Sequence, residues 1–248
     1  MRVDVIFGGA NVAPSDVAGR VVAVIDVLRA STSITAAVMN GARAVLPFES
    51  SEDAVSRSKS FEKGEFLLAG ERKMKPISGF DLGNSPLEYT REVVEGKTVL
   101  LTTTNGTPAI TNTAGARDVV VASYVNFTVV LAMLRTALRG GTDITLICAG
   151  RDRQFGLEDA GCAGRFVAHM VKRLTNVIVN DAAQACVLID KKFGDNIAKL
   201  FDASEHGQLL RTAGYVDDLA ACAAIDSYPV IPLYQERQIT MLGPDRSR

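Results

Sequence analysis

Residues 98–108 of the chain read TVLLTTTNGTP, an apolar run followed by hydroxyl side chains, one glycine and a proline. The run at 98–102 is typical of a buried parallel strand, and Pro108 suits the first turn of a helix. In an open α/β sheet, ligands bind where such a strand ends, and free backbone N–H groups there favour anions. The stretch therefore predicts an α/β fold, with a loop that is either a phosphate site or an ordinary turn capped by Thr107.

Carboxylates follow two other apolar runs at the same kind of junction. Asp26 ends the run at 21–25, and Glu158 and Asp159 open a helical pattern shortly after the run at 143–148. Where such side chains converge on one crevice, a few oxygen ligands suit Mg²⁺ held partly by water and partly by a substrate phosphate. The plainer alternatives are a cap or a local ion pair for Asp26, and a favourable interaction with the helix dipole for the other two.

Apolar runs and helical patterns alternate over the first 150 residues. We expect strands at 3–7, 21–26, 43–48, 66–69, 98–102, 118–121 and 143–148. Helical patterns lie between them, near 32–40, 52–60, 86–95, 108–114 and 127–139. This alternation predicts a three-layer α/β/α fold with a largely parallel or mixed sheet.

The pattern changes after residue 150. Residues 157–173 and 181–226 are mostly helical in period, and VIPLY at 230–234 reads as an edge or closing strand because of its prolines. We therefore expect a more helical carboxyl-terminal part. The chain is interpreted as a single region over 1–248, with two lobes that divide near 150–180 as the alternative.

Composition limits the classes of function. The chain has 248 residues and a formal net charge of −1, so the sequence indicates no broad basic surface and no nucleic-acid partner. We expect no membrane partner either, because no stretch is long and apolar enough to cross a bilayer. The amino terminus lacks the pattern of a signal peptide, which favours a cytoplasmic protein. A homo-oligomer is compatible with these features.

Neither the cysteines nor the histidines offer an evident catalytic centre. The four cysteines lie in apolar surroundings without metal-ligand spacing and are interpreted as reduced core thiols. Cys148 ends a strand but lacks a phosphate-cradling loop after it, so packing is its expected role. His169 and His206 have no serine or cysteine motif nearby, which argues against a triad hydrolase and gives them no central role in this interpretation.

Residues 70–86 form a long segment with little periodicity. Long irregular loops inside compact domains are often functional, and the cations here suit an anionic substrate. A solvated surface loop is the plainer alternative.

Several segments, taken in order, resemble the 2-phosphosulfolactate phosphatase family. The resemblance covers nearly the whole chain, because its last fragments lie close to the carboxyl terminus. The segments that carry it are DVLRAST at 26–32, GER at 70–72, GFDLGNSP at 79–86, TTTNGT at 102–107, CAG at 148–150, LED at 157–159, CAG at 162–164, and Cys222-Ala223 with Asp226.

The resemblance implies a Mg²⁺-dependent phosphoric monoester hydrolase, of a family first placed in coenzyme M biosynthesis. The implied reaction converts 2-phosphosulfolactate to sulfolactate and phosphate, and another small phosphorylated acid remains the alternative substrate. A non-catalytic protein that binds a phosphorylated or sulfonated metabolite is a second class of function. Carboxylates beside anion-binding loops argue against it, because they repel such ligands unless a metal intervenes.

Phosphate ester hydrolysis needs neutralised phosphoryl oxygens, an in-line nucleophile and a stabilised leaving oxygen. The expected catalytic residues are Asp26, Glu158 and Asp159. The expected Mg²⁺ ligands are some of Asp26, Glu71, Glu158 and Asp159. The expected substrate- and phosphate-binding residues are Ser31, Thr32, Thr103, Asn105, Gly106 and Thr107, with Arg29 and Arg72 as bidentate clamps.

Two nucleophiles remain open. Asp26 ends a strand, as nucleophilic aspartates often do, and attack by its carboxylate would give an aspartyl-phosphate. Haloacid-dehalogenase-type phosphatases work in this way, but they place a second aspartate two residues later, where this chain has Leu28. A metal-activated water is therefore the preferred nucleophile.

Overall fold

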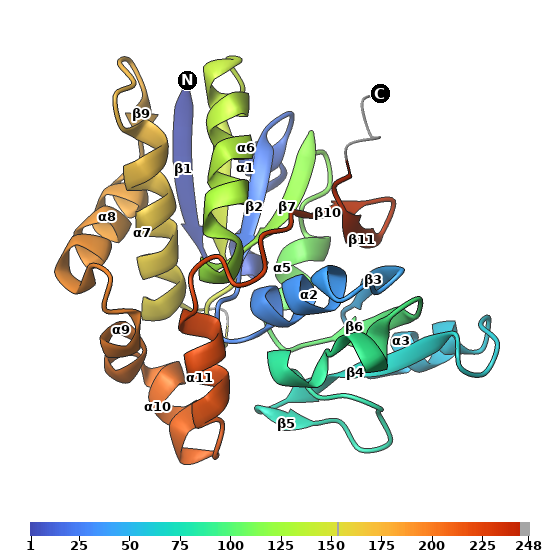
Figure 1. The fold of residues 1–248 in the computed structure, drawn as a ribbon. Helices are drawn as coiled ribbons and strands as arrows, with labels where there is room; N and C mark the ends of the chain where they lie inside the picture. The colour runs from blue at the N-terminus through green and yellow to red at the C-terminus, as the bar shows by residue number, and fades with distance from the viewer. Residues whose placement is uncertain (153, 244–248) are drawn as a thin grey trace.

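The computed structural model describes residues 1–152 and 154–243 and contains one eleven-stranded sheet within them (Figure 1). The strands are β1 (Arg2–Phe7), β2 (Val21–Ile25), β3 (Ala44–Phe48), β4 (Phe66–Arg72), β5 (Lys75–Pro76), β6 (Thr98–Thr102), β7 (Asp118–Ala122), β8 (Ile144–Cys148), β9 (Ile178–Val179), β10 (Pro232–Gln235) and β11 (Gln238–Met241). All strands expected before residue 150 are present.

Helices surround this sheet. The α-helices are α1 (Pro14–Val17), α2 (Ala30–Met39), α3 (Ser51–Ser58), α4 (Arg91–Val94), α5 (Gly106–Thr111), α6 (Phe127–Arg139), α7 (Leu157–Val171), α8 (Asp181–Phe193), α9 (Ile197–Ala203), α10 (Glu205–Thr212) and α11 (Val216–Ala223). Short 3₁₀ helices occupy Gly9–Asn11, Pro86–Glu88 and Tyr124–Asn126. In the described part of the chain, no helix combines the length and apolar character needed to cross a membrane.

The strand order is β5-β4-β6-β3-β11-β10-β7-β2-β8-β1-β9. Two blocks of this sheet are parallel within themselves, β4-β6-β3 and β7-β2-β8-β1-β9. The hairpin β10–β11 lies between them and pairs antiparallel with β7 on one side and β3 on the other. The sheet is therefore mixed, as the sequence allowed, with an antiparallel insert that joins two parallel blocks.

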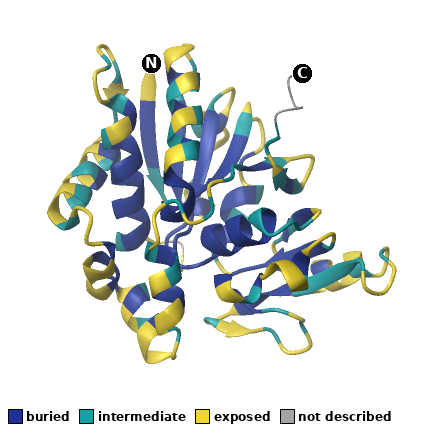
Figure 2. Ribbon diagram, viewed as in Figure 1, coloured by how far each residue is buried: buried dark blue, intermediate teal, exposed yellow. Residues whose placement is uncertain are grey.

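Strand β2 shows why the fold has three layers. Its five residues, VVAVI, are all buried. Because side chains alternate across a strand, Val21, Ala23 and Ile25 join the core beneath α6 and α7, whereas Val22 and Val24 pack with residues of α2 and α5. Figure 2 shows this arrangement as dark-blue strands between helices whose outer faces are exposed. The predicted α/β/α class is confirmed.

Strand twist brings the two blocks to one site. Strands β7, β10, β11 and β3 separate β2 from β6 in the sheet, and neighbouring strands rotate by roughly 20–25°. Figure 1 shows the β3-β6-β4 block running across the direction of β1, β2 and β7. The carboxyl ends of β4 and β6 consequently meet those of β2 and β8.

The helix expected over 86–95 is interrupted, which corrects the prediction. The 3₁₀ helix Pro86–Glu88 and helix α4 are separated at Tyr89 and Thr90. The Asn40 side-chain amide donates to the Tyr89 carbonyl at 2.6 Å, and the Tyr89 hydroxyl donates to the Gly83 carbonyl at 2.8 Å. These tertiary hydrogen bonds hold Tyr89 in a non-helical conformation with its ring buried, so the helix does not continue through residue 89.

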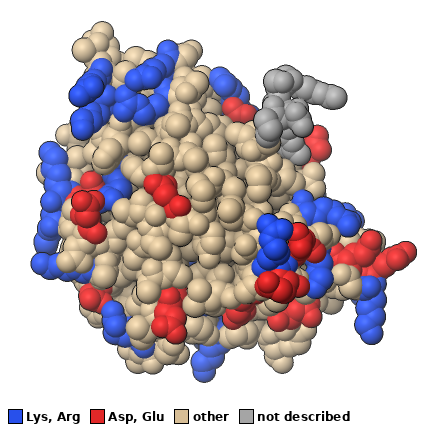
Figure 3. Space-filling view, in the orientation of Figure 1, with Lys and Arg blue, Asp and Glu red and all other residues tan. Residues whose placement is uncertain are grey.

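The carboxyl-terminal helices share a core with the sheet. One cluster of buried apolar side chains includes Ile25 of β2, Phe166 of α7 and Phe201 of α9. A division into two lobes near 150–180 stays a prediction. Figure 3 shows charged side chains of both signs distributed over one face of the molecule. The expected lack of a nucleic-acid partner stays a prediction.

Candidate active site

A cavity of about 290 Å³ opens where the two parallel blocks meet. The loops after β2, β4, β6 and β8 all contribute to its wall, as does helix α10. The lining residues are Asp26, Leu28, Arg29, Glu71, Lys73, Met74, Asn84, Thr103, Thr104, Asn105, Arg151, Asp152 and His206. Sequence segments that are far apart therefore form one polar cavity, at the sheet edge where α/β proteins bind ligands.

Asp26 lies at the floor of this cavity, directly after β2. Its backbone N–H donates to Ser31 Oγ at 2.9 Å, and its Oδ1 accepts from the Ala30 N–H at 3.2 Å. Burial raises the pKa of Asp26 to about 6, and the nearby carboxylates of Glu71 and Glu158 add to the increase, whereas His206 and the Ala30 amide oppose it. A carboxylate held in this way suits a functional group more than a surface cap.

Asp159 fastens the loops after β2 and β8 together. Its Oδ1 accepts from the Val27 N–H at 2.8 Å and its Oδ2 from the Gly150 N–H at 2.9 Å. Burial, with Glu158 and Asp26 nearby, raises the pKa of Asp159 well above its usual range. Asp159 is outside the described cavity wall, so its visible role is to position the two loops.

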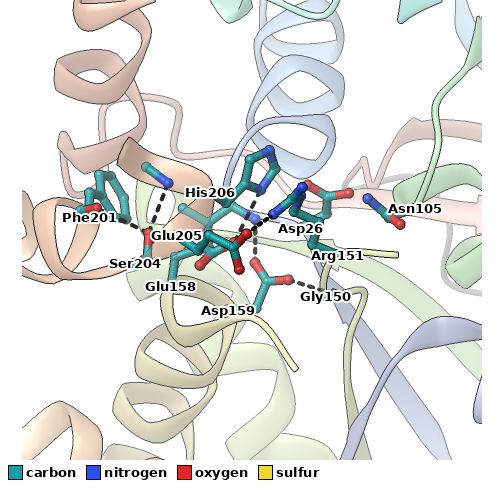
Figure 4. Close-up of polar contacts among 12 residues, drawn as sticks. Asp26, Asn105, Gly150, Arg151, Glu158, Asp159, Phe201, Ser204, Glu205 and His206 are labelled. Atoms are coloured by element: carbon teal, nitrogen blue, oxygen red, sulfur yellow. Dashed lines mark hydrogen bonds and ion pairs between the residues drawn. The ribbon is translucent and has the colours of Figure 1, made fainter. Parts of the chain in front are cut away.

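Glu158 contacts a residue to which the sequence interpretation gave no central role. Its Oε1 lies 3.2 Å from Nδ1 of His206, and Glu158 is only 2% exposed. Figure 4 shows His206 next to Asp26 and Arg151, with Glu158 and Asp159 beneath them. His206 also lines the cavity, a position that the sequence interpretation did not anticipate.

Two threonine hydroxyls hold the loop after β6, and part of this loop lines the cavity. The hydroxyl of Thr107 accepts from the Thr103 N–H and donates to the Thr103 carbonyl, and the Thr103 hydroxyl accepts from the Thr107 N–H. Thr103 and Asn105 nevertheless line the cavity, and Asn105 Oδ1 accepts from the Asp152 N–H at 3.1 Å. Thr107 lies inside α5, whose N-cap is Asn105, so the expected cap at Thr107 is wrong, and the phosphate site stays a prediction.

Gly106 brings the start of α5 against the carboxylate of Asp26. A Cβ atom at this position would lie 2.5 Å from Ala30 Cβ and 2.7 Å from Asp26 Oδ2. The close approach needs a residue without a side chain.

Glu71 joins the loops after β4 and β6. Its Oε2 accepts from the Met74 N–H and its Oε1 from the Thr104 N–H, each at 2.8 Å. The carboxylate lines the cavity and is 7% exposed. Glu71 therefore positions two loops while it contributes negative charge to the wall.

Arg29 lines the cavity but is already paired. Its Nη1 lies 2.5 Å from Asp218 Oδ2, its Nη2 donates to the Met74 carbonyl, and its guanidinium stacks 4.1 Å from the centre of the Tyr215 ring. Ser85 Oγ donates to the other Asp218 oxygen at 2.6 Å. The positive charge of Arg29 is thus partly neutralised before any ligand binds.

The other predicted binding residues differ in position. Arg72 donates to the Glu71 and Glu49 carbonyls and to Thr102 Oγ1, and it is not among the described residues of the cavity wall. Ser31 and Thr32 are buried, and their hydroxyls donate to the carbonyls of Val24 and Val27. Phosphate contacts by these three side chains stay predictions without support from their placement.

Besides His206, five polar lining residues were not among the predicted site residues: Lys73, Asn84, Thr104, Arg151 and Asp152. Arg151 Nη1 forms a 2.6 Å ion pair with Glu205. Asn84 is 5% exposed, and its Oδ1 has no hydrogen-bond partner among residues 1–152 and 154–243. The polar composition of segment 70–86 could have indicated Lys73 and Asn84. The CAG segment at 148–150 directly precedes Arg151 and could have indicated that residue.

The four cysteines are free and buried, which agrees with the prediction of reduced core thiols. Burial raises the pKa of the Cys148 thiol well above its usual range. Because the thiolate is the nucleophilic form, Cys148 is suited to packing.

No three His, Cys, Asp or Glu side chains in residues 1–152 and 154–243 form a group arranged to hold a metal ion. Mg²⁺, however, usually binds through one or two carboxylates, with waters and substrate phosphate completing its shell. Asp26 and Glu71 both line the cavity and fit that sparse mode. Glu158 and Asp159 are instead engaged by His206 and by backbone amides.

Comparison with known sequences gives extended matches. A sequence model of a family described as 2-phosphosulpholactate phosphatase matches residues 10–237. A probable 2-phosphosulfolactate phosphatase from Symbiobacterium thermophilum is 41% identical over 233 residues, which are 94% of this chain and 99% of that protein. One from Caldanaerobacter subterraneus is 38% identical over 85% of this chain and 86% of its own length. One from Clostridium botulinum (strain Alaska E43) is 35% identical over 98% and 100%.

Proposed function

Because the chain belongs to the 2-phosphosulpholactate phosphatase family, we propose that it hydrolyses 2-phosphosulfolactate to sulfolactate and phosphate. Family membership makes it a phosphoric monoester hydrolase, as the sequence predicted, and disfavours the non-catalytic binding protein. The observation that carries the proposal is the cavity in which Asp26, the loop after β6 and three cationic side chains face one another.

The cations of the wall suit a small polyanion. A phosphate with two further acidic groups carries about four negative charges, which need fixed donors as well as any metal. Lys73 supplies charge from the loop after β4. Arg151, from the loop after β8, pairs with exposed carboxylates, whereas the charge of Arg29 is offset by the buried Asp218. The proposal therefore assigns recognition of the acidic groups mainly to Lys73 and Arg151, a change from the expected clamp of Arg29 and Arg72.

The phosphate group is assigned to the floor of the cavity. Thr103 and Asn105 line it, and Gly106 places the start of α5 beside Asp26. Backbone N–H groups at a helix start favour negatively charged oxygens.

Mg²⁺ is the proposed cofactor, held by Asp26 and Glu71. When bound, it neutralises phosphoryl charge and lowers the pKa of a bound water. Leu28 also lines the cavity, at the position where haloacid-dehalogenase-type enzymes have their second aspartate. An apolar side chain there cannot serve as an acid or base, which favours water over Asp26 as the nucleophile. A cytoplasmic location, which rests on the sequence pattern of the amino terminus, and a place in coenzyme M biosynthesis, which rests on the resemblance, are further parts of this proposal.

Phosphate release from a panel of phosphorylated hydroxy acids, with and without sulfonate groups, tests the substrate. We expect the highest kcat/KM for 2-phosphosulfolactate. Equal or higher kcat/KM for acids without a sulfonate would assign the enzyme to another phosphorylated acid. No release from any compound in the presence of Mg²⁺ would contradict the proposed reaction.

A further inference from the structure

His206 lies at the beginning of α10, and the helix cap fixes its backbone. Ser204 Oγ accepts from the Gly207 N–H at 3.0 Å, which caps the first turn. The imidazole reaches the cavity wall and is the single imidazole among the described lining residues. The side chain is 14% exposed, so it is largely shielded from solvent but open to the cavity.

The contact with Glu158 determines which ring nitrogen of His206 is free to face the substrate. Its buried carboxylate lies 3.2 Å from Nδ1 of His206. An ionised carboxylate only accepts hydrogen bonds, so Nδ1 is the donor in this contact. The other ring nitrogen, Nε2, lies on the opposite side of the imidazole from this bond. A carboxylate that orients the ring of a catalytic base or acid is a recurring arrangement in enzymes.

Hydrolysis of an alkyl phosphate ester needs a proton donor for the leaving oxygen, which such a ring can supply. When its P–O bond breaks, the departing oxygen is an alkoxide, a strongly basic group that a positioned acid can protonate. Asp26 and Glu71 are assigned above to the phosphate end of the cavity. His206 lies on the wall that α10 supplies, beside Asp26 and Arg151 (Figure 4).

We propose that His206 is the general acid that protonates the leaving oxygen and that Glu158 is its positioning residue; this inference rests on the proposed phosphatase function. Water oxygen forms the new bond to phosphorus, and the electron pair of the broken P–O bond passes to the ester oxygen. That oxygen takes the proton from His206 Nε2 and becomes the hydroxyl of the product. Attacking water releases a proton in turn, and His206 recovers one from solvent.

Leaving-group dependence is the test. The full-length protein and its His206→Gln variant are assayed with Mg²⁺ on two esters, 2-phosphosulfolactate and nitrophenyl phosphate, whose nitrophenolate departs without protonation. The matched control is His169→Gln, because His169 lies on α7 outside the cavity wall and contacts the Arg165 carbonyl and the Phe127 ring. Thermal unfolding of each variant verifies that it folds.

We expect His206→Gln to lower kcat on the alkyl ester by roughly 10²- to 10⁴-fold, and to lower kcat on the aryl ester by less than about tenfold. Equal losses on both esters, or no loss on either, would overturn the assignment. A nucleophilic histidine, for example, would give equal losses. Wild-type protein that hydrolyses neither ester would instead refute the proposed function, and the inference with it.

Two further measurements separate proton donation from a structural role. Imidazole added to His206→Ala should restore part of the rate on the alkyl ester, and absence of rescue in folded protein counts against the proposal. Glu158→Gln should lower kcat on the alkyl ester, and the double variant should be no slower than His206→Gln alone, because Glu158 acts through that ring. Additive losses would assign Glu158 an independent role and overturn its positioning of His206.

Discussion

Arg29 and Asp218 are 189 residues apart in sequence, yet their side chains form a buried ion pair at 2.5 Å. Arg29 follows β2 and Asp218 lies on α11, so the pair connects the sheet edge to a carboxyl-terminal helix. Ser85 extends the contact to segment 70–86 through the second carboxylate oxygen. One carboxylate thus joins the loop after β2, segment 70–86 and α11.

Loss of that carboxylate should destabilise the protein strongly. We expect Asp218→Ala to lower the free energy of unfolding by about 3–5 kcal/mol, because it leaves the Arg29 charge buried without its partner. The control is Asp202→Ala, which removes the exposed ion pair of Asp202 with Arg211 and should cost about 0–1 kcal/mol. Urea unfolding of both variants provides the comparison, and similar losses would contradict the structural role of the buried pair.

Asp26 should be far more important for turnover than Asp16, a carboxylate whose Oδ2 accepts the Ala13 N–H near α1. We expect Asp26→Asn to lower kcat by roughly a hundredfold or more, since it removes a charge that faces the reacting phosphate. Asp16→Asn should retain near wild-type kcat. Phosphate release by the two variants at saturating substrate tests this. Equal activities would reduce Asp26 to a capping residue.

Asp26→Asn, which should lower kcat, should increase the stability of the metal-free protein at high pH. The pKa of Asp26 is raised to about 6 in the folded state, from an ordinary value of 3.8. Its protonated form therefore stabilises the fold below pH 3.8, and that stabilisation is lost as the pH rises through 6. In EDTA, Asp26→Asn should unfold at a higher temperature than wild type at pH 8, and the difference should disappear near pH 4. A Tm difference that does not change with pH would show that burying the ionised Asp26 carboxylate does not destabilise the fold.

Chelation should abolish activity without unfolding the protein. Asp26 and Glu71 are the buried carboxylates among the described residues of the cavity wall, and phosphate bound there would need its charge neutralised. We expect EDTA to stop phosphate release, Mg²⁺ to restore it, and the far-ultraviolet circular dichroism spectrum to stay unchanged. Full activity of metal-free protein in EDTA would refute the Mg²⁺ proposal.

Gly106→Ala should damage the site through a single methyl group. The added Cβ would lie 2.7 Å from Asp26 Oδ2 and 2.5 Å from Ala30 Cβ, so the backbone or the carboxylate must move. We expect a loss of about 1–3 kcal/mol in stability and a lower kcat/KM. At Gly140, the nearest atom to an added Cβ is 3.3 Å away, so Gly140→Ala is the matched control. Wild-type kcat/KM in both variants would show that the close packing at Gly106 is dispensable.

Local patterns predicted the framework well because the buried strands determine it. The run 21–25 is apolar at every position, as a strand covered on both faces requires, and Asp26, which follows it directly, lines the cavity. The interruption after 86–88 could not be anticipated. It depends on the bond from Asn40 to the Tyr89 carbonyl, a partner 49 residues away that no periodicity reveals.

The site shows the same division between local and distant signals. Asp26 and Asn105 follow strands, where the position of ligand-binding residues is a general rule. His206 comes from a helix whose docking depends on the packing of α9 and α10 against α7, and its partner Glu158 is 48 residues earlier. Arg29 lines the cavity, but its pairing with Asp218 could not be predicted because only the tertiary fold brings α11 to it.

The hairpin β10–β11 has a further consequence for how a cell makes this protein. A ribosome synthesises residues 232–241 after the strands of both parallel blocks, so each block can form before the piece that joins them exists. Until the hairpin emerges, β3 and β7 are open edges with unpaired backbone groups, which readily recruit strands from other chains. A chain whose synthesis stalls before residue 232 thus exposes two unpaired strand edges. We expect it to need chaperones most between completion of the two blocks and emergence of the hairpin.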